Sequence, residues 1–401
     1  MFFLLELLGM IRSLFERVFL SHWHSPAIRI QYWDGREARA GVGAPAVTLV
    51  IQEASVLREL LWNPSLGFGR AYQDGRLVVG GDLQAFLRGA FSFGAAVRGT
   101  SALRLLDWFL HLVRGRWLAS RAEENARFHY DTGNDFFQLW LDPSMTYSCA
   151  YFRTEADDLE KAQERKRELL CRKLDLQPGQ TLLDVGCGWG SLLFHAIERY
   201  GVRGIGVTPS SAQTAYIGEQ AKRHGVADRL TLHTTDWRQV GGVYDRVVSV
   251  GMYEHVGKEH ARAFFRKWRG WLKRDGVSVL HTIGGMDGKP PDPWIAENIF
   301  PGGYLPSLSA LTKHAAATGL VVADVENLWR HYVLTLAAWA KNYDAARGAI
   351  VRRSGERFAR TWWLYLQGSQ AAFATGRLCL WQIILTNGKR SAQSLTRGAW
   401  T

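Results

Sequence analysis

The sequence predicts an α/β domain built on a mostly parallel sheet, preceded by a smaller mixed α+β domain. From about residue 180, strand-like runs alternate with helical stretches, and such alternation builds a parallel sheet with helices on both faces. Residues 1–125 instead hold short alternating segments punctuated by turn signals such as Asp34-Gly35 and Asp74-Gly75. At 401 residues the chain is too long for one ordinary core. We therefore expect an accessory domain at 1–125 and a catalytic domain at 126–401.

Each element is expected from its own periodicity. In the first domain the expected strands are 28–33, 47–51 and 77–79, and the expected helices are 83–91 and 103–117. In the second domain the expected strands are 181–185, 204–207, 230–234, 244–250 and 277–282, with helices at 191–200, 210–224 and 259–272. Two later strands, 320–326 and 378–386, extend the sheet to seven, and the helical stretch at about 334–373 between them is an insertion.

The charged residues are unevenly distributed along the chain. The net charge is +12, and residues 341–401 carry +8 of it, with ten Lys and Arg against two Asp and Glu. This stretch mixes arginines with aromatic residues, namely Arg347, Arg352, Arg353, Arg357, Arg360 and Arg377 with Trp362, Trp363, Tyr365, Phe373 and Trp381. Such a segment suits an anionic lipid surface, nucleic acid or a solvated helix face, and charge alone does not separate the three.

The N-terminus and the cysteines bear on location. Residues 1–20 are apolar but interrupted by charged residues, which favours an amphipathic helix that packs on its domain or lies on a membrane over a secretory signal. No apolar run is long enough to cross a bilayer.

The four cysteines, Cys149, Cys171, Cys187 and Cys379, show neither metal-ligand spacing nor a disulfide framework. We therefore expect no metal site and a reducing cytoplasm.

A glycine-rich turn marks the expected cofactor site. Residues 182–190 read LLDVGCGWG and lie where the first strand of the second domain meets its first helix. Glycines there let the backbone approach a ligand at the carboxyl edge of the sheet. The spacing is G-x-G-x-G, at Gly186, Gly188 and Gly190, rather than the G-x-x-G ending of a dinucleotide site. It resembles the S-adenosylmethionine site of class I methyltransferases; the alternative is a tight turn without a ligand.

The polar residues at the next strand ends depart from that class in one respect. A carboxylate usually ends the second strand and holds the ribose, whereas this strand ends in Val207-Thr208-Pro209-Ser210. Thr208 or Gln213 is therefore the expected ribose contact. Asp236-Trp237 ends the third strand and suits the adenine, with the indole against its face.

Three further segments narrow the class. They are HYDTGNDFF at 129–137 with YSCAYF at 147–152, then SVGMYEHVG at 249–257, and then LHTIG at 280–284 with DPWI at 292–295 and IFPGG at 299–303. Together they resemble the cyclopropane-fatty-acyl-phospholipid synthases and their mycolic-acid-modifying relatives, in consistent order from 128 to 382. The extra N-terminal domain is typical of the phospholipid-acting branch.

This resemblance implies methyl transfer from S-adenosylmethionine to the cis double bond of an unsaturated phospholipid acyl chain, with bicarbonate assisting the proton loss that closes a cyclopropane ring. By the same resemblance, the cofactor-binding residues are Tyr147, Ser148, Asp184, Gly186, Gly188, Gly190, Thr208, Ser210, Gln213, Asp236 and Trp237. The residues expected around bicarbonate are Cys149, Glu254, His281, Ile283 and Tyr332. All five positions are occupied as in the family.

Alternatives stay open at this point. Methyl transfer followed by a hydride shift and proton loss elsewhere would give a methyl- or methylene-branched chain from the same cofactor and lipid. A non-catalytic lipid-binding paralogue is a further alternative, which the intact set of five residues disfavours. We expect a cytoplasmic protein on the inner face of the membrane, with an anionic lipid surface and no nucleic acid as partner. The first domain would serve lipid binding or a homodimer.

Overall fold

The computed structural model describes residues 2–97, 133–286, 288, 290–388 and 397–400. The chain forms two compact units. The first comprises residues Met1–Leu118, Asp292–Ile299 and Tyr343–Gly376, and the second comprises Ala119–Pro291, Phe300–Asn342 and Arg377–Thr401. The expected boundary near residue 125 and the expected helix at 103–117 fall outside the described residues. The division at 125 therefore stays a prediction.

The first unit has a four-stranded mixed sheet in the order β2-β1-β3-β4. Its elements are α1 (Phe2–Phe19), β1 (Ile28–Gln31), β2 (Glu37–Ala40), β3 (Val47–Ile51), α2 (Ser55–Trp62), α3 (Pro64–Gln73), β4 (Leu77–Gly81), α4 (Leu83–Val97) and α12 (Pro293–Asn298). The sequence pattern did not predict β2, α2 or α3. In α3 the pattern fails because glycine is a poor helix former. Here glycine is needed, since a Cβ on Gly69 would lie 2.2 Å from the indole of Trp294.

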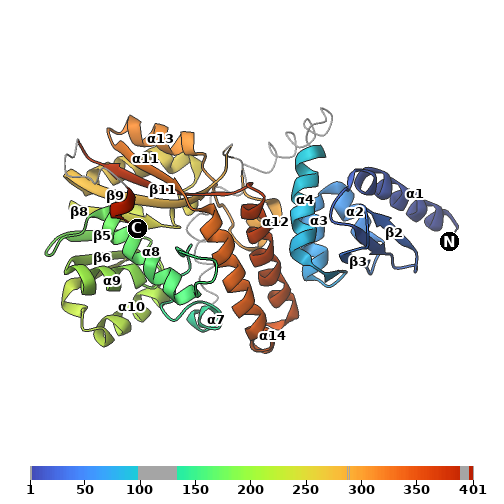
Figure 1. Cartoon of the computed structure of the whole chain (residues 1–401), viewed down its shortest axis with the longest axis horizontal. Coiled ribbons are helices and arrows are strands. Elements are labelled where there is room, and N and C mark those ends of the chain that lie inside the picture. Colours follow the sequence, from blue (N-terminus) through green and yellow to red (C-terminus); the bar gives the residue numbers. More distant parts are fainter. Residues whose placement is uncertain (1, 98–132, 287, 289, 389–396, 401) are drawn as a thin grey trace. The chain divides into compact units, whose positions relative to one another are not determined.

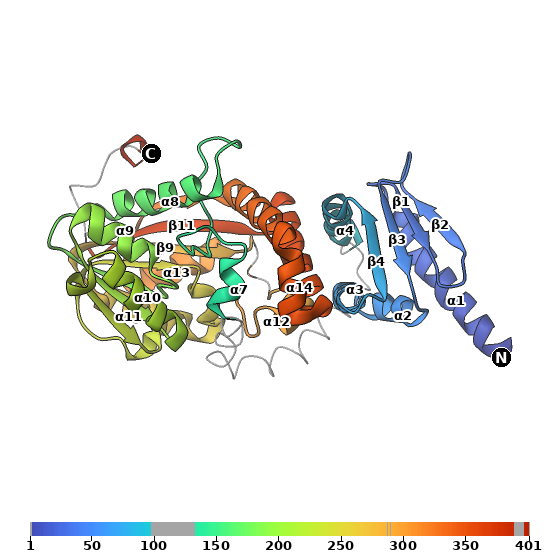
Figure 2. The same cartoon turned by 90° about the horizontal axis from the view of Figure 1, so that it is seen from below.

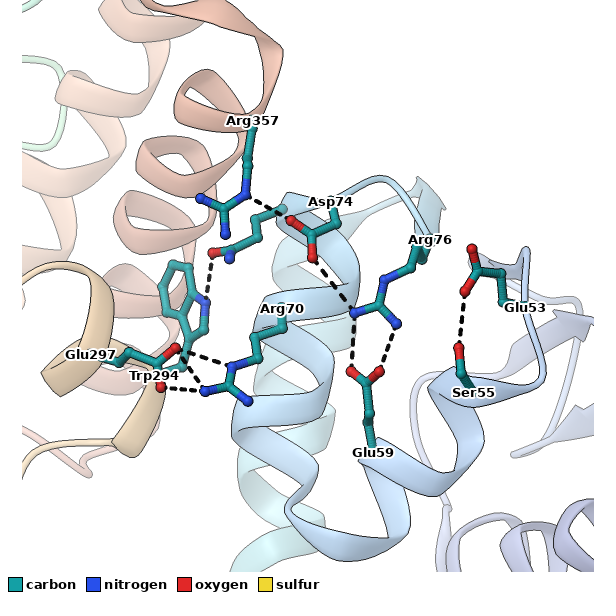
Figure 3. A network of polar contacts seen from close by, with 10 residues as sticks. Glu53, Ser55, Glu59, Arg70, Asp74, Arg76, Trp294, Glu297 and Arg357 are labelled. Atoms are coloured by element: carbon teal, nitrogen blue, oxygen red, sulfur yellow. Dashed lines mark hydrogen bonds and ion pairs between the residues drawn. The ribbon is translucent and has the colours of Figure 1, made fainter. Parts of the chain in front are cut away.

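Polar contacts join the later segments of this unit to α3 (Figure 3). The guanidinium of Arg70 donates to both carboxylate oxygens of Glu297 at 2.7–3.1 Å. The indole N–H of Trp294 donates to the side chain of Gln73 at 3.1 Å. Residues 292–299 are therefore held to the N-terminal part of the chain by an ion pair and a buried hydrogen bond.

The second unit is a seven-stranded sheet with helices on both faces (Figures 1 and 2). The strand order is β10-β11-β9-β8-β5-β6-β7. The strands are β5 (Thr181–Val185), β6 (Arg203–Thr208), β7 (Leu230–Thr234), β8 (Tyr244–Val250), β9 (Leu272–Gly284), β10 (Val321–Asn327) and β11 (Cys379–Thr386). The five strands β7, β6, β5, β8 and β9 run parallel, while β11 is antiparallel to both β9 and β10. The predicted mostly parallel seven-stranded sheet is confirmed.

Two hydrophobic cores lie on the two faces of this sheet. One face is covered by α8 (Leu159–Leu174), α9 (Ser191–Tyr200) and α10 (Ser211–Arg223), and the other by α11 (Ala261–Trp271) and α13 (Leu308–Ala317). On the α8 face, β5 contributes Leu182 and β9 contributes Val277 and Val279. Because side chains alternate along a strand, Asp184 and His281 lie on this same face. The alternation of side chains along β5 and β9 thus places the polar groups of Asp184 and His281 on the face of the sheet that α8 covers.

Helix α8 itself was not predicted from the sequence. It reads LEKAQERKRELLCRKL, so charges obscure its apolar stripe. Asp158 accepts from the backbone N–H of Lys161 and caps the N-terminus, and Asp175 ends the helix in a left-handed conformation. Its buried residues include Gln163, Lys166 and Lys173. The helix is therefore buried along a partly cationic face.

The long helix α14 (Trp329–Ala374) contains the predicted helical stretch and is interrupted at Gly355, whose φ is 84° and ψ 164°. Its residues up to Asn342 belong to the second unit and the remainder to the first.

The hypothesis that aromatic side chains of residues 341–401 face a lipid surface is largely wrong. Trp362, Tyr365, Phe373 and Trp381 are all buried in the core. No helix in the described ranges is both long enough and apolar enough to cross a bilayer.

Candidate active site

A pocket opens at the carboxyl ends of β5, β6 and β8, bordered by residues 145–148 and by α8. Ten of the eleven residues predicted to bind the cofactor line it, and these are Tyr147, Ser148, Asp184, Gly186, Gly188, Thr208, Ser210, Gln213, Asp236 and Trp237. The exception is Gly190, the residue immediately before α9. Parallel strands place their carboxyl ends at one edge of the sheet, which is why segments distant in sequence converge there.

The glycines of the turn differ in what they do. Gly188 has a φ of 56°, and a Cβ there would meet no atom within 4 Å. Its bare backbone therefore borders the open pocket. Gly190 has a φ of 83°, and a Cβ there would lie 3.2 Å from Ile217 and 3.3 Å from Phe194. Gly190 thus serves the helix turn and its packing on α10 rather than the pocket wall.

Neutral polar groups stand at the end of β6. The hydroxyl of Thr208 donates to the side-chain oxygen of Gln213 at 2.6 Å, and both residues are buried. Ser210 caps α10 by accepting from the backbone N–H of Gln213 at 3.3 Å. At the end of β7, the carboxylate of Asp236 accepts from the backbone N–H of Arg238 at 2.8 Å. The indole of Trp237 meets Phe264 edge to face at 5.2 Å, so its ring is fixed in the pocket wall.

Two ionisable groups of opposite sign share the pocket. The Oδ1 atom of Asp184 is buried without a hydrogen-bond partner, and burial raises the pKa of this carboxyl to about 7. The ammonium of Lys166 donates to the hydroxyl of Ser148 at 2.9 Å, and burial lowers its pKa to about 8. Within the described ranges no carboxylate lies in ion-pair distance of Lys166. Each group therefore has unused capacity for a ligand of the opposite charge.

Sequence reasoning missed Lys166. The signal that could have found it is helical spacing, because Gln163, Lys166 and Lys173 follow one another at three and seven residues. They recur beside Leu170 and Leu174, which belong to the core. A lysine at a core position is rarely buried without a purpose.

The predicted bicarbonate residues begin at the turn after β8. One carboxylate oxygen of Glu254 accepts from the backbone N–H of Ile283 at 2.6 Å. Its Oε2 atom is buried with no hydrogen-bond partner among the described residues. Burial raises the pKa of Glu254 to about 7, against the lowering effects of the Ile283 N–H and the Thr282 side chain.

His281 lies two residues before Ile283 on β9, on the same face of the strand. Its Nδ1 is 3.1 Å from the amide nitrogen of Gln382 on β11. Its Nε2 is buried without a partner. Burial, with the nearby cations Lys166 and Lys173, lowers the pKa of this imidazole to about 3. The ring is therefore neutral at physiological pH.

Cys149 packs against α14, the helix that carries Tyr332. Cys149 is buried, and its Sγ lies 3.9 Å from the hydroxyl of Thr335, one turn along α14 from Tyr332. Burial raises the pKa of the thiol, so it stays protonated. The structure thus joins Glu254 with Ile283, and Cys149 with the helix of Tyr332.

An aromatic wall runs from the pocket towards Tyr332. The ring of Tyr147, which lines the pocket, lies 5.2 Å from the indole of Trp339, and Trp339 lies 6.0 Å from Tyr332. Phe137 and Trp140 pack on Tyr147 at 5.3 and 5.5 Å. This wall is apolar and presents π faces, which suits an apolar substrate and a developing positive charge.

Family membership accords with this geometry. The family described as mycolic acid cyclopropane synthetase matches residues 118–383. The chain belongs to the cyclopropane synthetase family. A second family, a domain of unknown function, matches residues 15–96. The predictions of family and of enzyme class are confirmed, and this cyclopropane synthetase family member is an S-adenosylmethionine-dependent methyltransferase.

Relatives of known sequence fall into two groups. Along most of its length the chain is similar to a probable fatty acid methyltransferase of Pseudomonas putida, with 35% identity over 374 residues, or 91% of this chain and 93% of the relative. It is 34% identical to the cyclopropane-fatty-acyl-phospholipid synthase of Escherichia coli K12 over 375 residues, or 90% and 94%. Cyclopropane mycolic acid synthase 1 of Mycobacterium tuberculosis is 37% identical over 266 residues, which cover 63% of this chain and 93% of that enzyme.

Solved structures agree on the fold of the second unit. The cyclopropane synthase MmaA2 from Mycobacterium tuberculosis superposes with a TM-score of 0.63 at 35% identity, covering 66% of this chain and 98% of that one. The mycolic acid cyclopropane synthase CmaA1, solved with SAH and CTAB, gives a TM-score of 0.63 at 36% identity with the same coverage. The predicted class I methyltransferase fold is confirmed.

Proposed function

We propose that this enzyme transfers the methyl carbon of S-adenosylmethionine to the cis double bond of an unsaturated phospholipid acyl chain and closes a cyclopropane ring. The substrate is proposed from the length of chain over which the relatives are similar to this protein. Similarity to the phospholipid-acting relative of Escherichia coli spans 90% of this chain, whereas the mycolic acid synthase spans 63%. The N-terminal unit is thus shared with an enzyme named for phospholipids.

The pocket fits the proposed cofactor by its own chemistry. The unpartnered Oδ1 of Asp184 and the ammonium of Lys166 suit the two charged ends of an α-amino acid. Thr208 and Gln213 suit the ribose hydroxyls, and Trp237 suits the adenine face. The bound cofactor supplies an electrophilic methyl group. The protein's contribution is to hold that methyl in line with the alkene, which supplies roughly 7–11 kcal/mol of a barrier in a well-formed site.

Two buried polar atoms support a site for bicarbonate. Oε2 of Glu254 and Nε2 of His281 both lack partners among the described groups, and buried polar atoms are rarely left unpaired. Bound bicarbonate would supply the proton acceptor for ring closure. A carboxylate can face an anion only if a proton lies between them, and the raised pKa of Glu254 favours such sharing. Tyr332 and Cys149 complete the proposed set.

The aromatic wall excludes water from the reaction. Attack of the alkene on a methyl group leaves positive charge on the acyl chain, which water would quench. The ring of Tyr147, which lines the pocket, would offer a π face to such a charge, and Trp339 and Tyr332 continue the aromatic packing behind it. This wall therefore supports both the apolar substrate and the cationic course of the reaction.

A second product class is favoured by one relative. The Pseudomonas putida protein is named a probable fatty acid methyltransferase, and it matches this chain as extensively as the phospholipid enzyme does. Methyl transfer followed by a hydride shift to the neighbouring cationic carbon would place the positive charge on the carbon that bears the new methyl group. Loss of a proton from that methyl would then give a methylene-branched chain from the same cofactor and lipid. The two proposals differ in whether a hydride shifts before the proton leaves.

An anionic membrane surface on the cytoplasmic side is the proposed location of the reaction. Arg352 on α14 is exposed and would contribute ~1 kcal/mol to such binding. Arg357 and Arg360 instead pair with Asp74 at 2.8 Å and Glu356 at 3.0 Å, which reduces the charge they present. Met10 and Leu14 on α1 are exposed apolar side chains that could assist. A homodimer stays a separate prediction.

The direct test is incubation of the full chain with S-adenosylmethionine, bicarbonate and vesicles of phospholipid bearing one cis double bond per chain. Mass spectrometry of the released fatty acids should show the gain of one CH₂. Proton NMR separates the isomers, since ring protons identify a cyclopropane and vinyl protons a methylene branch. Unchanged phospholipid with methylation of free fatty acid alone would contradict the proposed substrate.

A further inference from the structure

A chain of hydrogen bonds crosses the protein interior behind His281. The ammonium of Lys173 on α8 donates to Glu326 on β10 at 2.5 Å and also to the side-chain oxygen of Gln382 on β11. The amide nitrogen of Gln382 lies 3.1 Å from Nδ1 of His281 on β9. Lys173, Gln382 and His281 are at most 3% exposed. Four side chains from four elements thus form one buried series.

The direction of these hydrogen bonds follows from the lysine. An ammonium group only donates, so the atom of Gln382 that faces Lys173 must be the amide oxygen. The amide nitrogen of Gln382 then faces His281 and donates to Nδ1. A nitrogen that accepts a hydrogen bond carries no proton. Because the neutral ring holds one proton, that proton is on Nε2.

The nitrogen so protonated is the one left without a partner. Nε2 of His281 is buried and unpaired within the described part of the protein. A buried N–H without an acceptor costs free energy, so this atom is arranged to donate to a group that binds. Without Lys173, the amide of Gln382 could turn over and present its oxygen to Nδ1. The ring proton would then sit on Nδ1, and Nε2 would present a lone pair to the same ligand.

We propose that Lys173 and Gln382 are positioning residues that fix the tautomer of His281, so that its Nε2–H donates to a bound oxyanion. Glu326 completes the series by keeping Lys173 charged, since its carboxylate opposes the lowering of the lysine pKa by burial. The inference rests on the proposed function in one respect, which is the identity of the oxyanion as bicarbonate. The tautomer itself does not depend on that identity.

Long-range ¹H–¹⁵N NMR of the ¹⁵N-labelled full chain reads the tautomer directly, and a spectrum of His281→Gln assigns the signal. We expect the wild type to show a protonated Nε2 and an unprotonated Nδ1 at His281 between pH 6 and 8. A protonated Nδ1 in the wild type would overturn the proposal without any variant being made.

Variants of Gln382 and Lys173 test whether these residues determine the tautomer of His281. In Gln382→Glu the new carboxylate accepts from both neighbours, so the proton of His281 should move to Nδ1. In Lys173→Met the two tautomers should mix. In Gln382→Glu the bicarbonate concentration for half-maximal activation should rise roughly 10–100-fold, the loss of a hydrogen bond to a charged group. In Lys173→Met it should rise only about twofold if the tautomers are equally populated, because that fraction of the enzyme keeps the Nε2 proton. Lys161→Met is the matched control, because Lys161 is an exposed lysine of the same helix paired with Glu164. It should leave both the spectrum and the activation unchanged.

If Lys173→Met fails to fold, Glu326→Gln is the milder variant, because the Glu326 side chain is 21% exposed. It should shift the same NMR signal in the same direction. A wild-type spectrum in Glu326→Gln, Gln382→Glu and Lys173→Met would overturn the role of the series. Tautomer shifts as expected in an enzyme indifferent to bicarbonate would instead contradict the proposed oxyanion and leave the tautomer assignment supported.

Discussion

One carboxylate oxygen of Glu254 is held by the backbone N–H of Ile283 at 2.6 Å, while its other oxygen is buried and unpaired. The side chain is therefore oriented by a backbone group of β9. Backbone groups of a central strand do not change rotamer, so the free oxygen has a fixed direction. A substitution of Glu254 can therefore test the role of the carboxylate without changing the packing of the neighbouring residues.

Glu254→Gln should lower turnover roughly 10²–10⁴-fold while leaving cofactor affinity unchanged. The amide keeps the acceptor for Ile283 but cannot share a proton with an anion in the same way. Product formation on vesicles and calorimetric titration with S-adenosylhomocysteine measure the two properties. Glu259→Gln, an exposed carboxylate in the same loop, is the control. Wild-type turnover in Glu254→Gln would remove this residue from the mechanism.

The same variant should change the pH dependence of stability. Burial raises the pKa of Glu254 from 4.5 to about 7, so the folded state binds more protons than the unfolded state between these values. Stability is therefore lost as pH rises through this window. Glu254→Gln should be more stable than wild type at pH 8, by on the order of 1–3 kcal/mol, and the difference should shrink at pH 5. Urea unfolding at both pH values measures it; an equal difference at both would contradict the burial argument.

Lys166→Met should weaken binding of S-adenosylhomocysteine roughly 10–100-fold, because an ionic hydrogen bond to the amino-acid end would be lost. Binding of 5′-methylthioadenosine, which lacks that end, should not change. Lys161→Met on the exposed side of α8 is the control. Equal losses for both ligands would mean that Lys166 supports the pocket without contacting the amino acid.

Gly188→Val should abolish cofactor binding, because its side chain would project into the open pocket beside the backbone. The matched control is Gly179→Val. Gly179 also has a positive φ, of 79°, and a Cβ added there would meet no atom within 4 Å, but it does not line the pocket. Both variants carry similar backbone strain, so a comparison of their affinities isolates the effect on the ligand. Retained affinity in Gly188→Val would make the motif structural.

Two arginines of α14 separate membrane docking from stability. Arg352→Gln should weaken binding to anionic vesicles roughly 5-fold, at ~1 kcal/mol for one cation. Arg357→Gln removes the same formal charge but breaks the ion pair to Asp74, so it should affect thermal stability more than binding. Co-sedimentation at rising salt tests both, since such binding weakens with screening. Equal loss of vesicle binding in the two variants would contradict this division.

The sheet and the glycine turn could be predicted because their signals are local. The strands at 181–185, 230–234 and 244–250 were predicted to the residue. The first and third are buried parallel strands, which read as short apolar runs bounded by turns, whereas the edge strand at 230–234 shows apolar and polar residues in alternation. The positions around Gly186 and Gly188 follow from turn geometry alone. For the same reason, Thr208 and Trp237 could be placed at the pocket from the ends of their strands.

The rest depends on contacts distant in sequence. Helix α8 has a polar sequence, and its burial is decided by the sheet beneath it, so the only local signal of Lys166 was its helical spacing from other buried positions. Distant contacts also decide the first unit, where α12 and part of α14 contact residues 227 and 283 positions earlier. The buried aromatic residues after 341 show the opposite error. Their composition was interpreted as that of an exposed surface, although these side chains lie in the core.

The buried Lys166 of α8 also bears on engineering and natural drift. Its ammonium donates to Ser148 and has no carboxylate in ion-pair distance within the described part of the protein. An unpaired buried charge costs free energy, so Lys166→Leu should raise the melting temperature. Lys173 differs, because its removal would leave Glu326 without its partner. Lys166→Leu would also remove a group that lines the cofactor pocket. Selection for heat resistance alone would therefore replace this lysine, and only selection for activity preserves it.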